Sequence, residues 1–133
     1  MKPTLKPGLA HTKKITVDES RVIAFMGDDC RVYATPRIIG DVEYTCRDFL
    51  LEHLDPGEDT VGTRVNWEHV GPALLGAEVT ISIQLTGVDG RRVTFEVAVN
   101  DGAEAVAHGS HERFVVDVQK MRERLLKKKA QRG

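Results

Sequence analysis

The chain has 133 residues, with 19 Lys and Arg against 20 Asp and Glu, and 41% of its residues are hydrophobic. This length and composition are typical of one globular domain with its own core, which excludes wholesale disorder, and we expect a single domain over residues 1–133. The net charge of −1 gives no general attraction to nucleic acid or to a membrane surface, and neither is an expected partner.

The sequence lacks the usual signals of a membrane protein, an exported protein or a metal site. It has no apolar run long enough to span a bilayer, and residues 1–14 lack the apolar centre of a signal peptide, so we expect a cytoplasmic protein. Cys30 and Cys46 set no disulfide framework, and no Cys-x-x-Cys or His-x-x-x-His cluster suggests a metal. We therefore expect no metal and no cofactor, with Cys46 as a small core residue.

The first part of the chain is expected to be mostly extended. Residues 1–8, which hold two prolines and two lysines, should form an irregular arm. A first strand is expected over residues 9–17, followed by a short apolar run at 21–26 and a polar turn at 27–31.

The strongest helical pattern runs from Thr35 to Leu54. Thr35 suits the N-cap position and Pro36 the first helical position, where its missing N–H costs nothing, and Asp-Pro-Gly after Leu54 ends the helix. Apolar residues recur at steps of three and four and form one stripe: Ile38, Ile39, Val42, Cys46, Phe49 and Leu50. Glu43 falls inside this stripe, and an ionised carboxylate on a packing face is costly unless it is paired or serves a site.

After the helix the pattern changes to a period of two, which is typical of strands. In residues 60–70 the expected faces are Val61, Thr63, Val65, Trp67 and His69 on one side, and Gly62, Arg64, Asn66 and Glu68 on the other. Further strands are expected over 79–86, 93–99 and 103–118, with a tight hairpin at Asp89-Gly90. Tight turns between consecutive strands predict an antiparallel meander.

The C-terminal residues 119–133 are expected to form a basic tail or a short helix. Seven Lys or Arg stand against one Glu over 119–132. A weak helical stripe could dock on the sheet; its members are Val118, Met121, Leu125 and Leu126. The basic end could attract an anionic partner, such as the phosphates of a nucleotide cofactor, but a solvated charged end is the more frequent case.

A long helix with a single apolar stripe must bury that stripe, and a sheet with one apolar face is the available partner. The expected fold class is α+β, with the antiparallel sheet curled around the helix. The long strands also offer edges through which two chains could pair.

Three residues carry the groups that acyl transfer uses, which are a hydroxyl, a carboxylate and an imidazole. They are Thr35, Glu43 and His69, and Thr35 lies two turns before Glu43 on roughly the same side of the helix. Gly62 is on the strand of His69, where a bare backbone N–H could approach a ligand oxygen. The sequence alone does not show that these residues meet.

Each candidate has a purely structural alternative. Thr35 could be a plain N-cap, and His69 could be a satisfied interior histidine, as could His108 and His111 on opposite faces of the last strand. Glu43 could form a structural ion pair with one of three arginines, namely Arg37, Arg47 or Arg113.

Four segments resemble one known family: Thr35–Glu43, LDPGEDTVGTRVNWEHV (54–70), GVDGRRVTFEVAVNDG (87–102) and GSHERFVV (109–116). They are similar to the fluoroacetyl-CoA thioesterase-like group of hotdog-fold acyl-CoA thioesterases. The resemblance lies in the register, with Glu eight residues after Thr and His a further 26 residues on, together with PGE, GRR and HER.

The resemblance implies a hotdog fold, a homodimer that could pair further into a tetramer, and hydrolysis of a short acyl-CoA thioester, with CoA as part of the substrate. It implies a catalytic set of Thr35, Glu43 and His69, with Gly62 and Arg113 as substrate-binding residues. Glu43 would act as nucleophile or base, His69 would transfer protons, and Thr35 would orient the carboxylate or the acyl group. Whether Glu43 or an activated water attacks the carbonyl stays open.

One departure from the family concerns the substrate. The fluoroacetate-resistance member has a longer, phenylalanine-bearing segment ahead of the catalytic threonine, whereas residues 18–34 hold Phe25 and Tyr33 without that pattern. We therefore expect a general or different acyl-CoA rather than selection for fluoroacetyl-CoA.

Two other functions fit the same fold. One is a non-catalytic acyl-CoA-binding or sensor module. The other is an enoyl-CoA hydratase or dehydratase, since Asp48 and His53 have the D-x-x-x-x-H spacing of some hydratases. Within a helix, however, this spacing places the two side chains on different sides.

Overall fold

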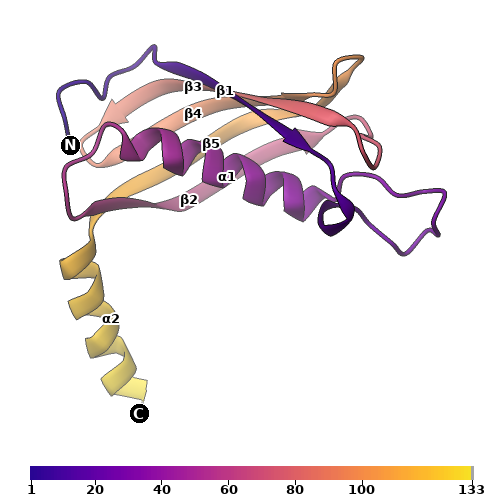
Figure 1. Cartoon of the computed structure of the whole chain (residues 1–133). Coiled ribbons are helices and arrows are strands. Elements are labelled where there is room, and N and C mark those ends of the chain that lie inside the picture. The colour runs from indigo at the N-terminus through magenta and orange to yellow at the C-terminus, as the bar shows by residue number, and fades with distance from the viewer. Residues whose placement is uncertain (133) are drawn as a thin grey trace.

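The computed structural model describes residues 1–132 as a five-stranded antiparallel sheet with one long helix across its inner face and a second helix beyond its last strand (Figure 1). The helices and strands are β1 (Ala10–Thr16), α1 (Thr35–Leu51), β2 (Glu58–His69), β3 (Glu78–Asp89), β4 (Arg92–Asn100), β5 (Ala105–Asp117) and α2 (Val118–Arg132), with a short 3-10 helix at Glu19–Arg21.

The N-cap of helix α1 lies one residue earlier than predicted, and the helix ends three residues earlier. Ala34 is the N-cap residue, Thr35 is the first helical residue, and the helix ends at Leu51 rather than Leu54. The prediction that Thr35 caps the helix is therefore wrong. Because its hydroxyl makes no capping hydrogen bond, it is available for another contact.

The predicted apolar stripe of α1 packs against the sheet. The buried residues of α1 are Ile38, Val42, Thr45, Cys46, Phe49 and Leu50. Opposite them lie the alternate residues of β3 and β4, and Phe49 meets Phe95 edge to face with ring centroids 6.4 Å apart. The α+β architecture with the sheet curled around α1 is confirmed, and Cys46 is a core residue as predicted.

The order of strands across the sheet is β1-β3-β4-β5-β2. β3, β4 and β5 form a meander, and the predicted hairpin joins β3 to β4 through Gly90 and Arg91. β2 does not pair with β3, however, but lies beyond β5 at the edge of the sheet, so the prediction of one continuous meander is wrong. Residues 70–77, which include Gly71-Pro72, connect β2 at one edge of the sheet to β3 near the opposite edge. A tight turn is too short for this connection.

A bulge in β2 changes which side chains face α1. Gly62 pairs with Arg113 and Arg64 pairs with Glu112, so Thr63 is an extra residue and the two-residue period shifts by one. As a result, Gly62 before the bulge and His69 after it point to the same face. The prediction that they lie on opposite faces is wrong, because a bulge leaves no mark in a period-two pattern.

The segment before α1 is tied to the helix by a buried tyrosine. The Tyr33 hydroxyl donates a hydrogen bond to the Asp41 carboxylate, and Arg21 Nε donates to Asp41 Oδ2 over 2.8 Å. The apolar run predicted at 21–26 forms no strand apart from one bridge between Val22 and Tyr33, and Phe25 is 83% exposed.

Helix α2 extends away from the sheet rather than docking on it (Figure 1). None of its residues is buried, and Leu125 and Leu126 are more than half exposed. The predicted docking is wrong. This basic helix has too few apolar side chains to bury against the sheet. Residue 133 of the predicted basic end lies outside the described residues. Within residues 1–132, neither helix is long and apolar enough to cross a membrane.

Two glycines test how tightly this sheet is packed. Gly109 of β5 lies opposite Trp67, and a Cβ there would come within 2.2 Å of the Asn66 backbone oxygen. We expect Gly109→Ala to lower the free energy of unfolding by about 1–3 kcal/mol, measured by urea denaturation, because backbone atoms must move to admit the methyl group. Gly40→Ala is the control. Its Cβ would meet open space within α1, and a gain of about 0.5–1 kcal/mol is expected. Equal stability of the two variants would contradict this account of the packing.

Candidate active site

Thr35 and His69 form the first half of the candidate site. Thr35 Oγ1 lies 2.7 Å from His69 Nδ1, a hydrogen bond that joins the first turn of α1 to the end of β2. Both side chains are exposed in the single chain. His69 is therefore not the satisfied interior histidine of the alternative interpretation, because its partner is the candidate hydroxyl and its Nε2 remains available to a ligand.

A small pocket of about 260 Å³ opens beside this pair. Its walls are Ile38 and Ile39 of α1, Val65 and Trp67 of β2, and Ala107 of β5. The Thr35 hydroxyl and the His69 ring supply its polar atoms, so the pocket offers an apolar space next to one hydrogen-bonded pair.

Glu43 and Arg113 form the second half of the site. Glu43 Oε2 lies 3.5 Å from Arg113 Nη1, and the Glu43 side chain is 37% exposed. The pattern predicted that Glu43 lies within the apolar stripe. In the structure its carboxylate is half-buried at the margin of that stripe. Of the three arginines considered as its partner, Arg113 pairs with it, whereas Arg47 binds Asp59 through two nitrogens.

Arg113 is held in place from its other side by the neighbouring strand. Its Nε donates to Thr60 Oγ1 over 2.8 Å, and its Nη2 donates to the Thr60 carbonyl oxygen over 2.9 Å. An arginine that is 4% exposed needs such partners, and they leave Nη1 directed toward Glu43.

His111 belongs to this cluster, although its sequence context suggested only an interior histidine. His111 Nδ1 lies 2.8 Å from the Arg64 carbonyl oxygen, which requires an N–H there, so Nε2 can accept from Arg113 Nη1 at 3.3 Å. Burial lowers the pKa of His111, and the positive charge of Arg113 lowers it further. His111 is thus a neutral acceptor that orients Arg113. The HER motif could have predicted this contact, because His111 and Arg113 are two residues apart on a strand and therefore share a face.

Gly62 keeps one side of the carboxylate open. A Cβ on Gly62 would lie 3.2 Å from Glu43 Oε2 and 3.4 Å from Arg113 Nη1. An open groove of about 530 Å³ runs past this point along α1, and its lining includes Glu43, Arg47 and Arg113. The absence of a side chain at position 62 therefore leaves room for a ligand atom against both charged groups.

The two halves of the site do not meet within one chain. Eight residues of α1 separate Thr35 from Glu43, which corresponds to about 12 Å along the helix axis. Across residues 1–132, no hydrogen bond or ion pair joins Glu43 to Thr35 or His69. Ile39 lines both pockets, so the halves are neighbours along one face of α1.

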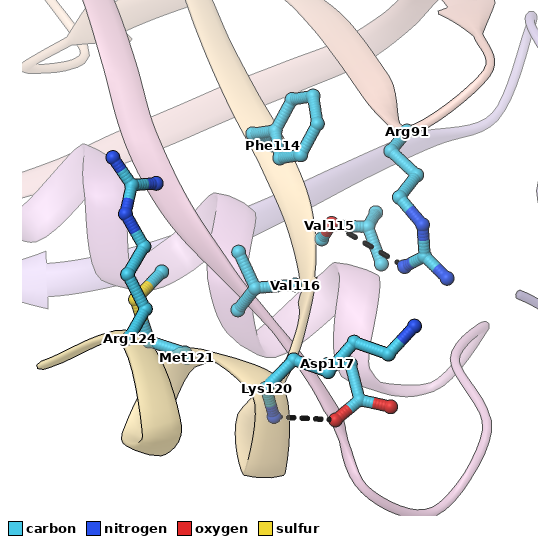
Figure 2. A pocket seen from close by; sticks show the side chains of 8 residues that line it. All are labelled: Arg91, Phe114, Val115, Val116, Asp117, Lys120, Met121 and Arg124. Atoms are coloured by element: carbon cyan, nitrogen blue, oxygen red, sulfur yellow. Dashed lines mark hydrogen bonds between the residues drawn. The ribbon is translucent and has the colours of Figure 1, made fainter. Parts of the chain in front are cut away.

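The remaining candidates lie apart from this face. A pocket of about 220 Å³ at the base of α2 has Arg91, Lys120 and Arg124 around Phe114 (Figure 2), but Phe114 is on the opposite face of β5 from Arg113. His53 bonds Thr4 through Nδ1 at 2.8 Å. No group of three or more His, Cys, Asp or Glu in the described part of the chain is placed to hold a metal ion.

Comparison with known proteins identifies the family. The family described as fluoroacetyl-CoA-specific thioesterase (FlK) matches residues 17–119. The chain belongs to this family. The fluoroacetyl-CoA thioesterase of Streptantibioticus cattleyicolor is 32% identical over 97 residues, which cover 73% of this chain and 70% of that protein. The predicted family membership is thereby confirmed, and with it the membership of a thioesterase family.

Solved structures agree with this assignment. The structure of the fluoroacetyl-CoA thioesterase FlK superposes with a TM-score of 0.85 at 26% identity, covering 93% of this chain and 97% of that one. A hot-dog-like protein from Thermanaerovibrio acidaminovorans gives a TM-score of 0.84 at 23% identity, covering 96% and 93%. The second likeness concerns the fold alone, and together they confirm the predicted hotdog fold.

The neutral state of His111 predicts a pH dependence of stability. Because its pKa is lowered in the folded protein, the unfolded chain binds the proton more readily, and stability should fall as the pH drops below about 6.5. We expect the urea midpoint to fall between pH 7.5 and pH 5.5, and to fall less in His111→Phe. His108→Gln is the control, since His108 is exposed on the other face of β5 and should keep the wild-type dependence. Identical pH profiles for wild type and His111→Phe would rule out this origin.

Proposed function

We propose that this protein hydrolyses the thioester of a short acyl-CoA to the free acid and CoA. The observation that carries the proposal is the Glu43 carboxylate, which Arg113 holds from one side and the bare Gly62 leaves open on the other. Membership of a thioesterase family supports the same chemistry. Water is the second substrate, and the proposed reaction uses no cofactor.

Glu43 is the proposed catalytic carboxylate. It would either attack the thioester carbonyl carbon, giving an anhydride that water then hydrolyses, or take a proton from the water that attacks. In the first route the acyl carbon exchanges its bond to sulfur for a bond to a Glu43 oxygen, and water then splits this anhydride into the free acid and the Glu43 carboxylate. In the second route the water oxygen replaces sulfur on the acyl carbon directly. In both routes the departing sulfur gains a proton. Arg113 beside Glu43 would stabilise the negative charge that develops on the carbonyl oxygen, and Gly62 leaves space for that oxygen.

His69 and Thr35 are proposed to handle protons and position the substrate. Their hydrogen bond through Nδ1 fixes the orientation of the imidazole ring. This leaves Nε2 to protonate the departing thiolate, or to accept a proton from the attacking water. Thr35 would orient His69 through this hydrogen bond. The resemblance assigns it the role of orienting the carboxylate or the acyl group.

A homodimer through β2 would bring the two halves of the site together. β2 is a twelve-residue edge strand whose Val61 and Val65 are each 41% exposed, and such long edges usually find a partner. In an antiparallel pairing of two β2 strands about an axis between Val65 and Asn66, Gly62 would face the partner's His69. Glu43 of one chain would then share a site with the imidazole of the other. Two such dimers could associate further into a tetramer.

The acyl group is proposed to be one other than fluoroacetyl, or a general short acyl group. Phe25 is exposed, and no residue of 18–34 lines the two pockets of the site. A phenylalanine that selects a fluorinated group would have to reach one of them. The cytoplasmic location expected from the sequence remains a prediction that cell fractionation would test.

Removing the charge of Glu43 tests the catalytic role. We expect Glu43→Gln to lower kcat about 10²–10⁴-fold while the fold is kept, because the side-chain shape is unchanged. The assay is release of free thiol, followed with a thiol-reactive dye, from acetyl-, fluoroacetyl-, malonyl-, butyryl- and phenylacetyl-CoA. Glu96→Gln is the control, since Glu96 is exposed on β4, away from the candidate site and from the β2 edge, and should keep wild-type activity.

Two other results of this assay would count against the proposal. Full activity with increased thermal stability in Glu43→Gln would make Glu43 a tolerated buried carboxylate. Tight binding of acyl-CoA without turnover by the wild type would indicate a binding or sensor module, and hydration of crotonyl-CoA would indicate a hydratase.

Mixing two inactive variants tests whether the site is shared between chains. We expect purified heterodimers of Glu43→Gln with His69→Ala to recover about half of wild-type activity, because one of their two sites would combine intact residues from both chains. Differently tagged Glu43→Gln homodimers are the control and should stay inactive. Inactive heterodimers would place each site within one chain, and a monomeric mass in light scattering would exclude the dimer.

A further inference from the structure

The pocket beside Thr35 and His69 differs in chemistry from the groove beside Glu43. Hydrocarbon and aromatic side chains make up its walls, and no Lys, Arg, Asp or Glu lines it. The groove, in contrast, has Glu43, Arg47 and Arg113 along it. Because an unpaired charge is costly to place in an apolar space, the pocket of one chain suits an uncharged hydrocarbon group. The partner chain's groove, which the proposed dimer would bring beside that pocket, suits the polar remainder of the acyl-CoA.

Trp67 lines the pocket and adjoins the Arg113 cluster through His111. It packs against Gly109 of β5, where a Cβ would come within 2.6 Å of Trp67 Cδ1. It also meets the His111 ring edge to face, with centroids 6.0 Å apart, and His111 in turn contacts Arg113. The indole is therefore the part of the pocket wall that adjoins His111 and, beyond it, Arg113.

The size of the pocket is limited by this wall. At about 260 Å³ the pocket is smaller than the roughly 300–1,000 Å³ of sites for drug-sized ligands. Trp67 has the largest side chain among its lining residues, so its replacement would change the volume most. Its indole N–H is buried with no hydrogen-bond partner, so substitution by an apolar residue removes no hydrogen bond and alters mainly the space.

We propose that Trp67 sets the acyl selectivity of this protein: the pocket takes a short, uncharged acyl group, and the indole limits its length. This inference rests on the proposed thioesterase function and names the substrate class for it. Acyl groups that end in a carboxylate, such as malonyl, are excluded by the apolar lining. Longer chains are excluded because the Trp67 indole, the largest side chain of the lining, limits the space.

Chain-length selectivity in Trp67 variants tests the proposal. The ratio of kcat/KM for hexanoyl-CoA to that for acetyl-CoA should rise about 10–100-fold in Trp67→Ala, and by less in Trp67→Phe, as methylenes gain a place in the pocket. Malonyl-CoA should remain poor for every variant. Phe114→Ala is the matched control, an aromatic residue on the outer face of β5 (Figure 2), and should leave the ratio unchanged.

A second measurement does not depend on turnover. Trp67 is the one tryptophan of the chain, so intrinsic fluorescence reports directly on this pocket. A non-hydrolysable thioether analogue of butyryl-CoA should change the emission, whereas CoA alone should not. Trp67→Phe keeps an aromatic ring and serves for selectivity if Trp67→Ala does not fold.

The outcomes separate this inference from the proposed function. Hydrolysis by the wild type with an unchanged chain-length ratio in folded Trp67 variants would overturn the inference and keep the thioesterase. A wild-type preference for malonyl-CoA would overturn it as well. If no acyl-CoA is hydrolysed, the proposed function fails and the titration decides: an emission change specific to the butyryl analogue supports the pocket assignment, and equal responses to the analogue and CoA overturn it.

Discussion

The candidate site depends on one buried cation. Arg113 projects from β5 into the space under α1, where a guanidinium without partners would be strongly unfavourable. Thr60 on β2, His111 on its own strand and Glu43 on α1 together satisfy it, so three elements converge on one side chain. This requirement explains why Glu43 can stand at the margin of an apolar stripe. The carboxylate compensates a charge that is already there, and it remains accessible because position 62 has no side chain.

The bulge in β2 allows the same strand to contribute both to the Arg113–Glu43 cluster and to the Thr35–His69 pair. In a regular strand, Gly62 and His69 would face opposite sides, since they are seven residues apart. The extra residue Thr63 restores both to the inner face, so that Gly62 lies against Glu43 while His69 reaches Thr35. Bulges are frequent next to active sites because they redirect side chains in this way. Here the bulge lets a single edge strand serve both the charged groove and the apolar pocket.

Much of this arrangement follows from the sequence, and the exceptions have physical causes. Periodicity predicts α1, its packing face and the strands, because the core requires alternation on buried faces, and it draws attention to Glu43 as an exception within the stripe. The position of β2 next to β5 depends on a crossover that local pattern does not encode. The capping of α1 by Ala34 and the bulge at Thr63 are decided by tertiary contacts, and they are what free the Thr35 hydroxyl and align Gly62. His111 is a buried histidine, as the structural alternative allowed, and its part in the site comes from Arg113, two residues along the same strand.

The wall that Trp67 forms also bears on the electrostatics of the site. A carboxylate and a guanidinium interact more strongly when water is excluded from one side of them, because the effective dielectric constant is lower. The indole lines the pocket beside Thr35 and packs against His111, which contacts Arg113. In the proposed dimer, a hydrocarbon acyl group in that pocket would exclude water from the shared site, and the Arg113 charge of the other chain would then act more strongly on an oxyanion beside its Glu43. An acyl group that fits would thus strengthen the interactions that favour its own transition state, whereas a shorter one would leave water in place. Selectivity for the acyl group and stabilisation of the reaction would then have the same physical origin.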